Sequence, residues 1–151
     1  MSLAVALHAL AAVIWVGGMF FAYVVLRPSV AELAAPERLL LWRRVLGRFF
    51  TWVLGCIAVL LLSGYHMVFA GFGGFGGVGA HVHVMQLTGW VMFLLFLHLY
   101  FAPWKRFRAA VDGGDLDVAA VQLGTIRVVV AINLALGLLT VAVGTGGRFW
   151  G

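Results

Sequence analysis

The residues of this chain best suited to chemistry are its five histidines, and three of them share a level. An α-helix rises 1.5 Å per residue, which places His8, His66 and His83 about 27, 26 and 28 Å above the charged ends of their apolar segments. An imidazole inside an apolar membrane segment is costly to leave without a partner and usually faces the interior of a helix bundle. We therefore predict that these three side chains meet in one layer near one end of a bundle.

A level pair of imidazoles supports two kinds of metal chemistry. His8 paired with His83 or with His66 can hold haem iron from both sides, which suits electron transfer because no coordination position stays open. The same three residues can instead bind copper, since imidazole suits Cu(II) and the nearby thioethers of Met67 and Met85 suit Cu(I). We predict haem b as the cofactor, with copper as the alternative, and these three histidines as the metal ligands.

Four other residues extend the candidate cofactor site. Trp15 shares a helix face with His8 at 100° per residue, so we expect it beside the cofactor. His98 lies only about 6 Å from the charged end of its helix, at a depth similar to that of Asn133 and Arg127. These three side chains form either a polar cluster or part of the surroundings of a second haem.

The composition identifies the elements that must position these residues. Of the 151 residues, 64% are hydrophobic and only 10% are charged, whereas about a quarter of a soluble domain is charged. All charges fall within residues 27–48, within residues 105–127 or at Arg148, which leaves three long charge-free stretches. The composition excludes an ordinary soluble enzyme and a nucleic-acid-binding module. Cys56 and Ser63 lack a nearby acid–base pair, so catalysis by a side-chain nucleophile is not expected.

The charge-free stretches predict the fold. A membrane span needs about 20 apolar residues, so the first and last stretches hold one span each and the middle stretch holds two. Because short connections join neighbouring helices, we predict an all-α integral membrane protein that forms an antiparallel, up-down bundle of four transmembrane helices in a single domain. The predicted spans are residues 3–26, 49–70, 82–102 and 128–146.

Local signals refine this prediction. Pro36–Arg48 is predicted to form a short amphipathic helix that leads into the second span, with Pro36 in its first turn. The glycines of residues 71–79 predict an irregular loop, and Asp115 is predicted to cap the last helix. A stripe on that helix is expected to face the bundle interior; it consists of Asn133, Gly137, Thr140 and Gly144.

The distribution of basic residues predicts the orientation in the membrane. Nine of the ten Lys and Arg residues lie in the connection between spans one and two or in that between spans three and four, and only Arg148 lies on the other side. Connections rich in Lys and Arg stay in the cytoplasm. Both termini are therefore predicted to be outside, which in a bacterium is the periplasm.

Three segments resemble a known family. Residues 7–28 (LHALAAVIWVGGMFFAYVVLRP), 83–108 and 126–144 resemble the first, third and last helices of CopD-type copper-resistance membrane proteins. The first segment is also similar to the HemJ-type protoporphyrinogen oxidases. The resemblance implies a four-helix domain of the bacterial inner membrane whose histidines bind haem b or copper, with His8, His83 and His98 at the matching positions.

Three functions remain open at this point. The first hypothesis is a small b-type cytochrome, an oxidoreductase that passes electrons between a periplasmic partner and quinone or another acceptor. The alternatives are a copper-binding or copper-transport protein of copper resistance and a haem-dependent protoporphyrinogen oxidase. All three place the chain in contact with membrane lipid. The glycines permit close contact within one bundle or between two, so a homo-oligomer is compatible with each.

Overall fold

The computed structural model describes residues 1–149, within which every regular element is a helix. The α-helices are α1 (Ser2–Phe20), α2 (Arg27–Ser29), α3 (Ala35–His66), α4 (Ala80–Phe101), α5 (Pro103–Asp112) and α6 (Leu116–Gly146). Two π-helical segments, η1 (Phe21–Leu26) and η2 (Met67–Gly71), follow α1 and α3, and two short 3₁₀ turns are η3 (Phe75–Gly77) and η4 (Gly147–Phe149).

Among the described residues, four helical segments are long and apolar enough to cross a membrane. Each has at least 28 residues, and their most apolar windows have mean hydropathies between 1.6 and 2.3. At 1.5 Å per residue, every segment exceeds the roughly 30 Å of a bilayer's hydrocarbon core. This confirms the predicted all-helical protein with four candidate spans, which are Ser2–Ser29, Ala35–Gly71, Ala80–Asp112 and Leu116–Gly146.

Two predicted helix ends differ from the structure. The amphipathic segment Pro36–Arg48 is not a separate helix, because α3 runs from Ala35 to His66 without a break. One buried stripe continues through both parts of α3 and holds them together; it consists of Leu39, Trp42, Leu46, Phe50, Val53 and Ile57. Helical structure also continues past residue 26, the predicted end of the first span, and runs through Pro28 to Ser29.

The passage through Pro28 coincides with a change of hydrogen-bond register. Proline has no N–H and its ring crowds the carbonyl one turn earlier, so an ordinary α-helix is disturbed there. In the preceding segment η1, the N–H of Arg27 donates to the carbonyl oxygen of Ala22, five residues earlier. Such π segments are often found at functional sites.

The two glycine-containing turns form as the sequence predicts. Asp115 caps α6, since its side chain accepts a hydrogen bond of 3.1 Å from the backbone N–H of Val118. Gly114, just before it, has a φ of 76°, a conformation that favours glycine. In the loop between α3 and α4, Gly73 and Gly74 also have positive φ angles.

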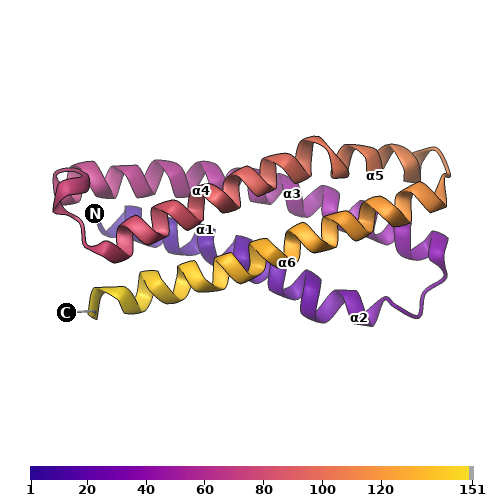
Figure 1. Ribbon diagram of the computed structural model, residues 1–151, viewed down its shortest axis with the longest axis horizontal. Helices are drawn as coiled ribbons and strands as arrows, with labels where there is room; N and C mark the ends of the chain where they lie inside the picture. The colour runs from indigo at the N-terminus through magenta and orange to yellow at the C-terminus, as the bar shows by residue number, and fades with distance from the viewer. Residues whose placement is uncertain (150–151) are drawn as a thin grey trace.

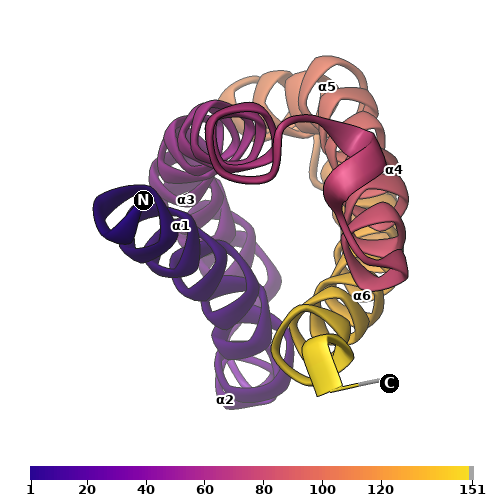
Figure 2. The same ribbon diagram turned by 90° about the vertical axis from the view of Figure 1, so that its left-hand side faces the viewer.

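The helices form an elongated bundle with both termini at one end (Figure 1). The glycine-rich loop of residues 71–79 lies at this same end, which we call the terminal end, whereas the turns at residues 30–34 and 113–114 lie at the opposite end. Viewed from the terminal end, α1 and α3 make one side of the bundle and α4 and α6 the other (Figure 2). The closest packing follows this arrangement, with α1 against α3 and α4 against α6.

Aromatic rings fill the middle of the bundle. Phe50 of α3 contacts Phe96 of α4 with ring centres 5.5 Å apart and Trp104 of α5 at 5.2 Å, both edge to face. Trp15 of α1 meets Phe96 from another side, at 6.2 Å. Edge-to-face contacts of this kind add about 0.5–1.5 kcal/mol each beyond the burial of apolar area. This cluster fixes the relative positions of the helices that carry the histidines.

Candidate functional site

Four of the five histidines lie towards the terminal end. His8 is in the second turn of α1, His66 is the last residue of α3, and His81 and His83 are in the first turn of α4. His66 and His83 are exposed, whereas His8 and His81 are half-buried. The terminal end therefore presents imidazoles from three helices, two of them open to the surroundings.

His8 is oriented by a hydrogen bond across the bundle. Its Nδ1 lies 2.9 Å from the hydroxyl oxygen of Ser63 in α3, and that hydroxyl donates to the carbonyl oxygen of Val59 at 2.6 Å. With the one hydroxyl proton of Ser63 on its bond to Val59, Nδ1 of His8 is the donor to Ser63. The lone pair of His8 is then on Nε2, the ring atom available to a metal ion.

A glycine makes this orientation of His8 sterically feasible. A Cβ atom at Gly64 would lie 3.3 Å from Cε1 of the His8 ring, a tighter approach than such atoms normally make. The small residue lets the imidazole lie close against α3 beside Ser63. The same closeness means that a larger residue at this position would displace the ring.

A second polar contact joins α3 to α4 near the same level. The hydroxyl oxygen of Tyr65 accepts hydrogen bonds from Nε2 of Gln86 at 2.6 Å and from the indole N–H of Trp90 at 3.2 Å. His83 lies three residues beyond Gln86 towards the loop, while Ser63 lies two residues before Tyr65. The contact between His8 and Ser63 and the start of α4 at His83 thus both lie within about one helical turn of this polar contact.

Methionine sulfur is also present at the terminal end. The side chain of Met85 packs over Gly144 of α6, and that of Met1 packs over Gly71 after α3. Met67 directly follows His66. His81 fits against two glycines, since its ring lies beside Gly79 and its Cβ beside Gly147. Thioether and imidazole are thus available together, which is the donor set that suits copper in its two oxidation states.

The prediction that the side chains of His8, His66 and His83 meet is wrong for this structure. Within residues 1–149, no three side chains of His, Cys, Asp or Glu come together closely enough to hold a metal ion. His8 contacts Ser63, whereas the ring of His83 lies 6.3 Å from that of Phe75 in the loop. A metal ion at this end would have to use thioether sulfur or fewer imidazoles than three.

The remaining predicted site residues lie elsewhere. Trp15 is 5% exposed and belongs to the aromatic core. Asn133 is 2% exposed; its Nδ2 donates to the carbonyl oxygen of Met92 at 3.2 Å, and its Oδ1 is buried without a partner. His98 is exposed on α4, so it does not share the buried surroundings of Asn133. Arg127 lines a separate cleft together with Arg27.

The stripe of small and polar residues on α6 faces the interior as predicted. A Cβ atom at Gly137 would meet Val16 of α1 at 2.9 Å and Met92 of α4 at 3.2 Å. Thr140 donates to the hydroxyl of Thr88 in α4 or to the carbonyl of Leu136, at 2.7 Å in both cases. These contacts keep α4 close to α6 and so fix the start of α4, where His81 and His83 are found.

The comparison with family models decides the classification. The model described as copper resistance protein D matches residues 43–146, more than half of the chain. The chain belongs to the copper resistance protein D family. This confirms the resemblance seen in the sequence, and with four candidate spans it identifies a multi-pass protein of the bacterial inner membrane in contact with lipid. No curated protein and no solved structure matches the chain significantly.

The matched family segment covers most of the candidate site but not all of it. His8 and Trp15 precede residue 43, so the contact between His8 and Ser63 links the matched segment to a helix outside it. The other candidate residues lie within the match; they are His66, His83, His98, Arg127 and Asn133.

Proposed function

We propose that this protein handles copper ions in copper resistance and binds them at the terminal end of its bundle. Membership of the copper resistance protein D family is the observation that carries this proposal. In this proposal copper is the ion that the protein captures and passes on, and it is not a resident cofactor. The imidazoles and thioethers at the terminal end supply ligands of the appropriate chemistry.

His8, His66 and His83 are the proposed imidazole ligands, with Met67 and Met85 as neighbouring thioethers. The exposure of His66 and His83 supports a role in first capture of an ion. The hydrogen bond to Ser63 supports a role for Nε2 of His8 as a deeper, oriented ligand. An ion that enters from outside would meet the exposed imidazoles first and the half-buried one next.

The orientation that we propose places these ligands on the periplasmic side. The arginines and lysines of residues 27–48 and 105–127 lie away from the terminal end, and such residues favour the cytoplasm. The bundle is then an antiparallel up-down domain with both termini in the periplasm. This orientation suits capture of copper from the periplasm, and passage across the bilayer would need further ligands, which a second copy of the chain could contribute at a subunit interface.

A b-type cytochrome that serves quinone or a redox protein is less well supported. Two axial imidazoles must approach one iron from opposite sides, whereas Nδ1 of His8 contacts Ser63 and the ring of His83 lies 6.3 Å from that of Phe75 in the loop. A protoporphyrinogen oxidase would need the same haem. The family match names copper resistance and gives a haem no support.

Titration of the full-length protein in detergent with Cu(I), in competition with a chromophoric chelator, tests the proposal. We expect His8→Ala and His83→Ala each to weaken Cu(I) binding at least about tenfold, because each removes a ligand. His98→Ala is the matched control, since His98 lies on the same helix as His83 but far from the terminal end, and it should leave the affinity unchanged.

The same preparation separates copper from haem. Protein produced with ample haem and copper should show no Soret band and no α band after reduction with dithionite, and should bind copper. A haem spectrum that disappears in His8→Ala and His83→Ala would overturn the copper proposal in favour of the cytochrome. Copper binding that is equal in the wild type and in all three variants would show that the terminal end is not the site.

A further inference from the structure

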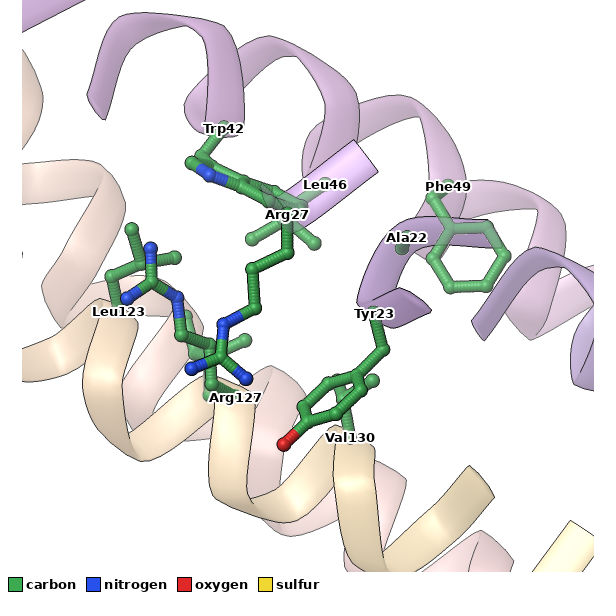
Figure 3. Close-up of a pocket in the computed structure, with 10 residues that line it drawn as sticks. Ala22, Tyr23, Arg27, Trp42, Leu46, Phe49, Leu123, Arg127 and Val130 are labelled. Carbon is green, nitrogen blue, oxygen red and sulfur yellow. The ribbon is translucent and has the colours of Figure 1, made fainter. Parts of the chain in front are cut away.

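A cleft towards the end opposite the terminal end joins three of the four spans. It lies between the end of the first span, α3 and α6, and its ten lining residues include Tyr23, Arg27, Trp42, Phe49, Arg127 and Val130 (Figure 3). Arg27, Arg127 and Tyr23 carry polar groups beside the cleft, but the accessible lining of the cleft itself is apolar. None of the ten residues is Asp or Glu.

Figure 3 shows both guanidinium groups at this cleft, that of Arg27 from the end of the first span and that of Arg127 from α6. Arg27 is stacked on the ring of Tyr23, with its guanidinium carbon 4.9 Å from the ring centre, which holds the side chain over the cleft. The Nε of Arg127 is buried without a hydrogen-bond partner. Arg27 is exposed and Arg127 is half-buried. Like charges repel, so an anion beside the two guanidinium groups would stabilise this arrangement.

A third donor in the cleft also lacks a partner. Trp42 is only 4% exposed, and its indole N–H makes no hydrogen bond. Figure 3 shows the indole on the α3 side of the cleft, across from the two guanidinium groups. A buried donor without an acceptor is destabilising, so an anion that accepts from it would remove that penalty.

Other arginines near this end have their own partners or extend into the surroundings. Arg43 makes a bidentate ion pair with Asp112, at 3.1 and 3.2 Å, and Arg38 donates to the carbonyl oxygens of Ala31 and Leu33. Arg44 is exposed. An arginine that only extends from a membrane helix to reach water keeps its guanidinium group solvated. The buried Nε of Arg127 differs from this, because the side chain is turned into the cleft.

The depth of the cleft indicates which anion it would take. Arg27 directly follows the charge-free stretch of residues 1–26, and Arg127 directly precedes the charge-free stretch of residues 128–147. Both therefore lie where the hydrocarbon core meets the headgroups. The enclosed space is only about 20 Å³, room for about one water molecule, so a flat ring cofactor does not fit inside. A phosphate can bind at the mouth while an acyl chain covers Phe49 and Val130.

We propose that this cleft binds the phosphate group of an anionic phospholipid from the cytoplasmic leaflet, held at its mouth by Arg27 and Arg127, and that the side chains around Trp42 shift to let its buried indole N–H donate to the phosphate. The lipid would bridge the end of the first span, α3 and α6. It would neutralise both guanidinium groups and satisfy the indole donor. This proposal does not depend on copper binding, which concerns the opposite end of the bundle.

Native mass spectrometry of the detergent-purified full chain, supplied with phosphatidylglycerol or phosphatidylcholine, tests the proposal. The wild type should retain phosphatidylglycerol at least about tenfold better than phosphatidylcholine, given two arginines near the headgroup. The double variant Arg27→Gln/Arg127→Gln should lose this preference. The matched control Arg44→Gln/Arg108→Gln removes the same charge from exposed positions at the same end and should keep it.

Two further variants keep the test valid if the double Gln variant does not fold. Trp42→Phe keeps an aromatic ring but removes the donor, and should weaken retention of phosphatidylglycerol severalfold. Arg27→Lys/Arg127→Lys keeps the charge and should retain most of the preference. Equal lipid retention in the wild type and in Trp42→Phe and both arginine variants would overturn the proposal, as would equal losses in the exposed-arginine control.

A soluble phosphate is the other source of the same chemistry. The thermal unfolding midpoint should rise with phosphatidylglycerol and should stay unchanged with a large excess of inorganic phosphate. If inorganic phosphate raised the midpoint as much and displaced the bound lipid, the cleft would be a site for a soluble phosphate ligand and the lipid proposal would be wrong.

Discussion

The contact between His8 and Ser63 determines how one imidazole can act. When Ser63 donates to the carbonyl oxygen of Val59 it accepts from His8, and this tautomer leaves Nε2 of His8 as the free nitrogen. Hydrogen bonds of this type fix the tautomer and the direction of metal-binding histidines and tune their affinity. In our proposal Ser63 is therefore a positioning residue, which acts on the ion through His8.

Replacement of Ser63 by Ala should weaken Cu(I) binding about tenfold, because His8 loses the partner that fixes its ring. Chelator competition measures the affinity, and ¹⁵N NMR of the imidazole should show the two tautomers becoming mixed. Thr145→Ala is the control: Thr145 lies near the same end and also donates to a carbonyl four residues earlier, but it does not touch a histidine. If Ser63→Ala kept wild-type affinity, Ser63 would have only a structural role.

Part of this site could be predicted from the sequence and part could not. Distances along each helix place His8, His66 and His83 near one end, because helical rise is nearly constant. The role of Ser63 was missed, since a serine in a helix normally donates to the carbonyl four residues earlier and its second contact depends on the neighbouring helix. The surroundings of the His83 side chain could not be predicted either, because they depend on the loop residue Phe75.

At the scale of elements, close helix contacts depend on particular small residues. Gly137 is in contact with both Val16 and Met92, so three helices meet where α6 has no side chain. Gly89 of α4 differs from it, because an added Cβ would meet nothing within 4 Å. The packing of α6 therefore depends on Gly137, whereas Gly89 has no such role, although both lie in membrane-spanning helices.

The substitution Gly137→Val should destabilise the protein by about 1–3 kcal/mol through overpacking. Unfolding in detergent, followed by circular dichroism, measures the change in the free energy of unfolding. Gly89→Val is the matched control and should have a clearly smaller effect, since the same β-branched side chain enters open space. Similar losses for both variants would mean that helix propensity, not the contact of α6 with α1 and α4, determines the result.

The cap of α6 gives a second test at this scale. Asp115→Ala should cost about 1 kcal/mol, because the N–H of Val118 loses its acceptor. Hydrogen exchange of the amides in the first turn of α6 should become about fivefold faster. Asp117→Ala removes a carboxylate from the same turn without removing the cap, so its effect should be smaller. An unchanged rate in Asp115→Ala would contradict the cap.

The fold was easier to predict than the helix ends. Charge-free length and hydropathy are sufficient for four spans, because each span must satisfy its backbone polar groups within itself. The ends of helices depend on tertiary packing instead. α3 extends back to Ala35 because Leu39, Trp42 and Leu46 are buried against other helices, and α1 is followed by helical structure past Pro28 through a π segment. Neither feature follows from local propensity.

At the scale of the whole molecule, the two proposed sites lie at opposite ends of one bundle. The terminal end has histidine and methionine, whereas the other end has arginines that face a cleft at headgroup depth. This polarity has a functional meaning only if the terminal end faces the periplasm, since a copper ion would arrive there and the anionic lipid would belong to the cytoplasmic leaflet. The orientation in the membrane is thus the assumption that both proposals share.

Cysteine labelling in intact cells tests that orientation directly. Gly76→Cys places a thiol in the loop at the terminal end, where an added Cβ meets nothing within 4 Å, and Glu32→Cys places one in the exposed turn after α2. A membrane-impermeant maleimide should label Gly76→Cys in intact spheroplasts and Glu32→Cys only after the membrane is permeabilised. The native Cys56 is buried, so the wild-type chain should stay unlabelled in both conditions and serves as the control. The reverse pattern would place the histidines in the cytoplasm, where capture of periplasmic copper could not occur, and would assign the arginine cleft to the outer leaflet.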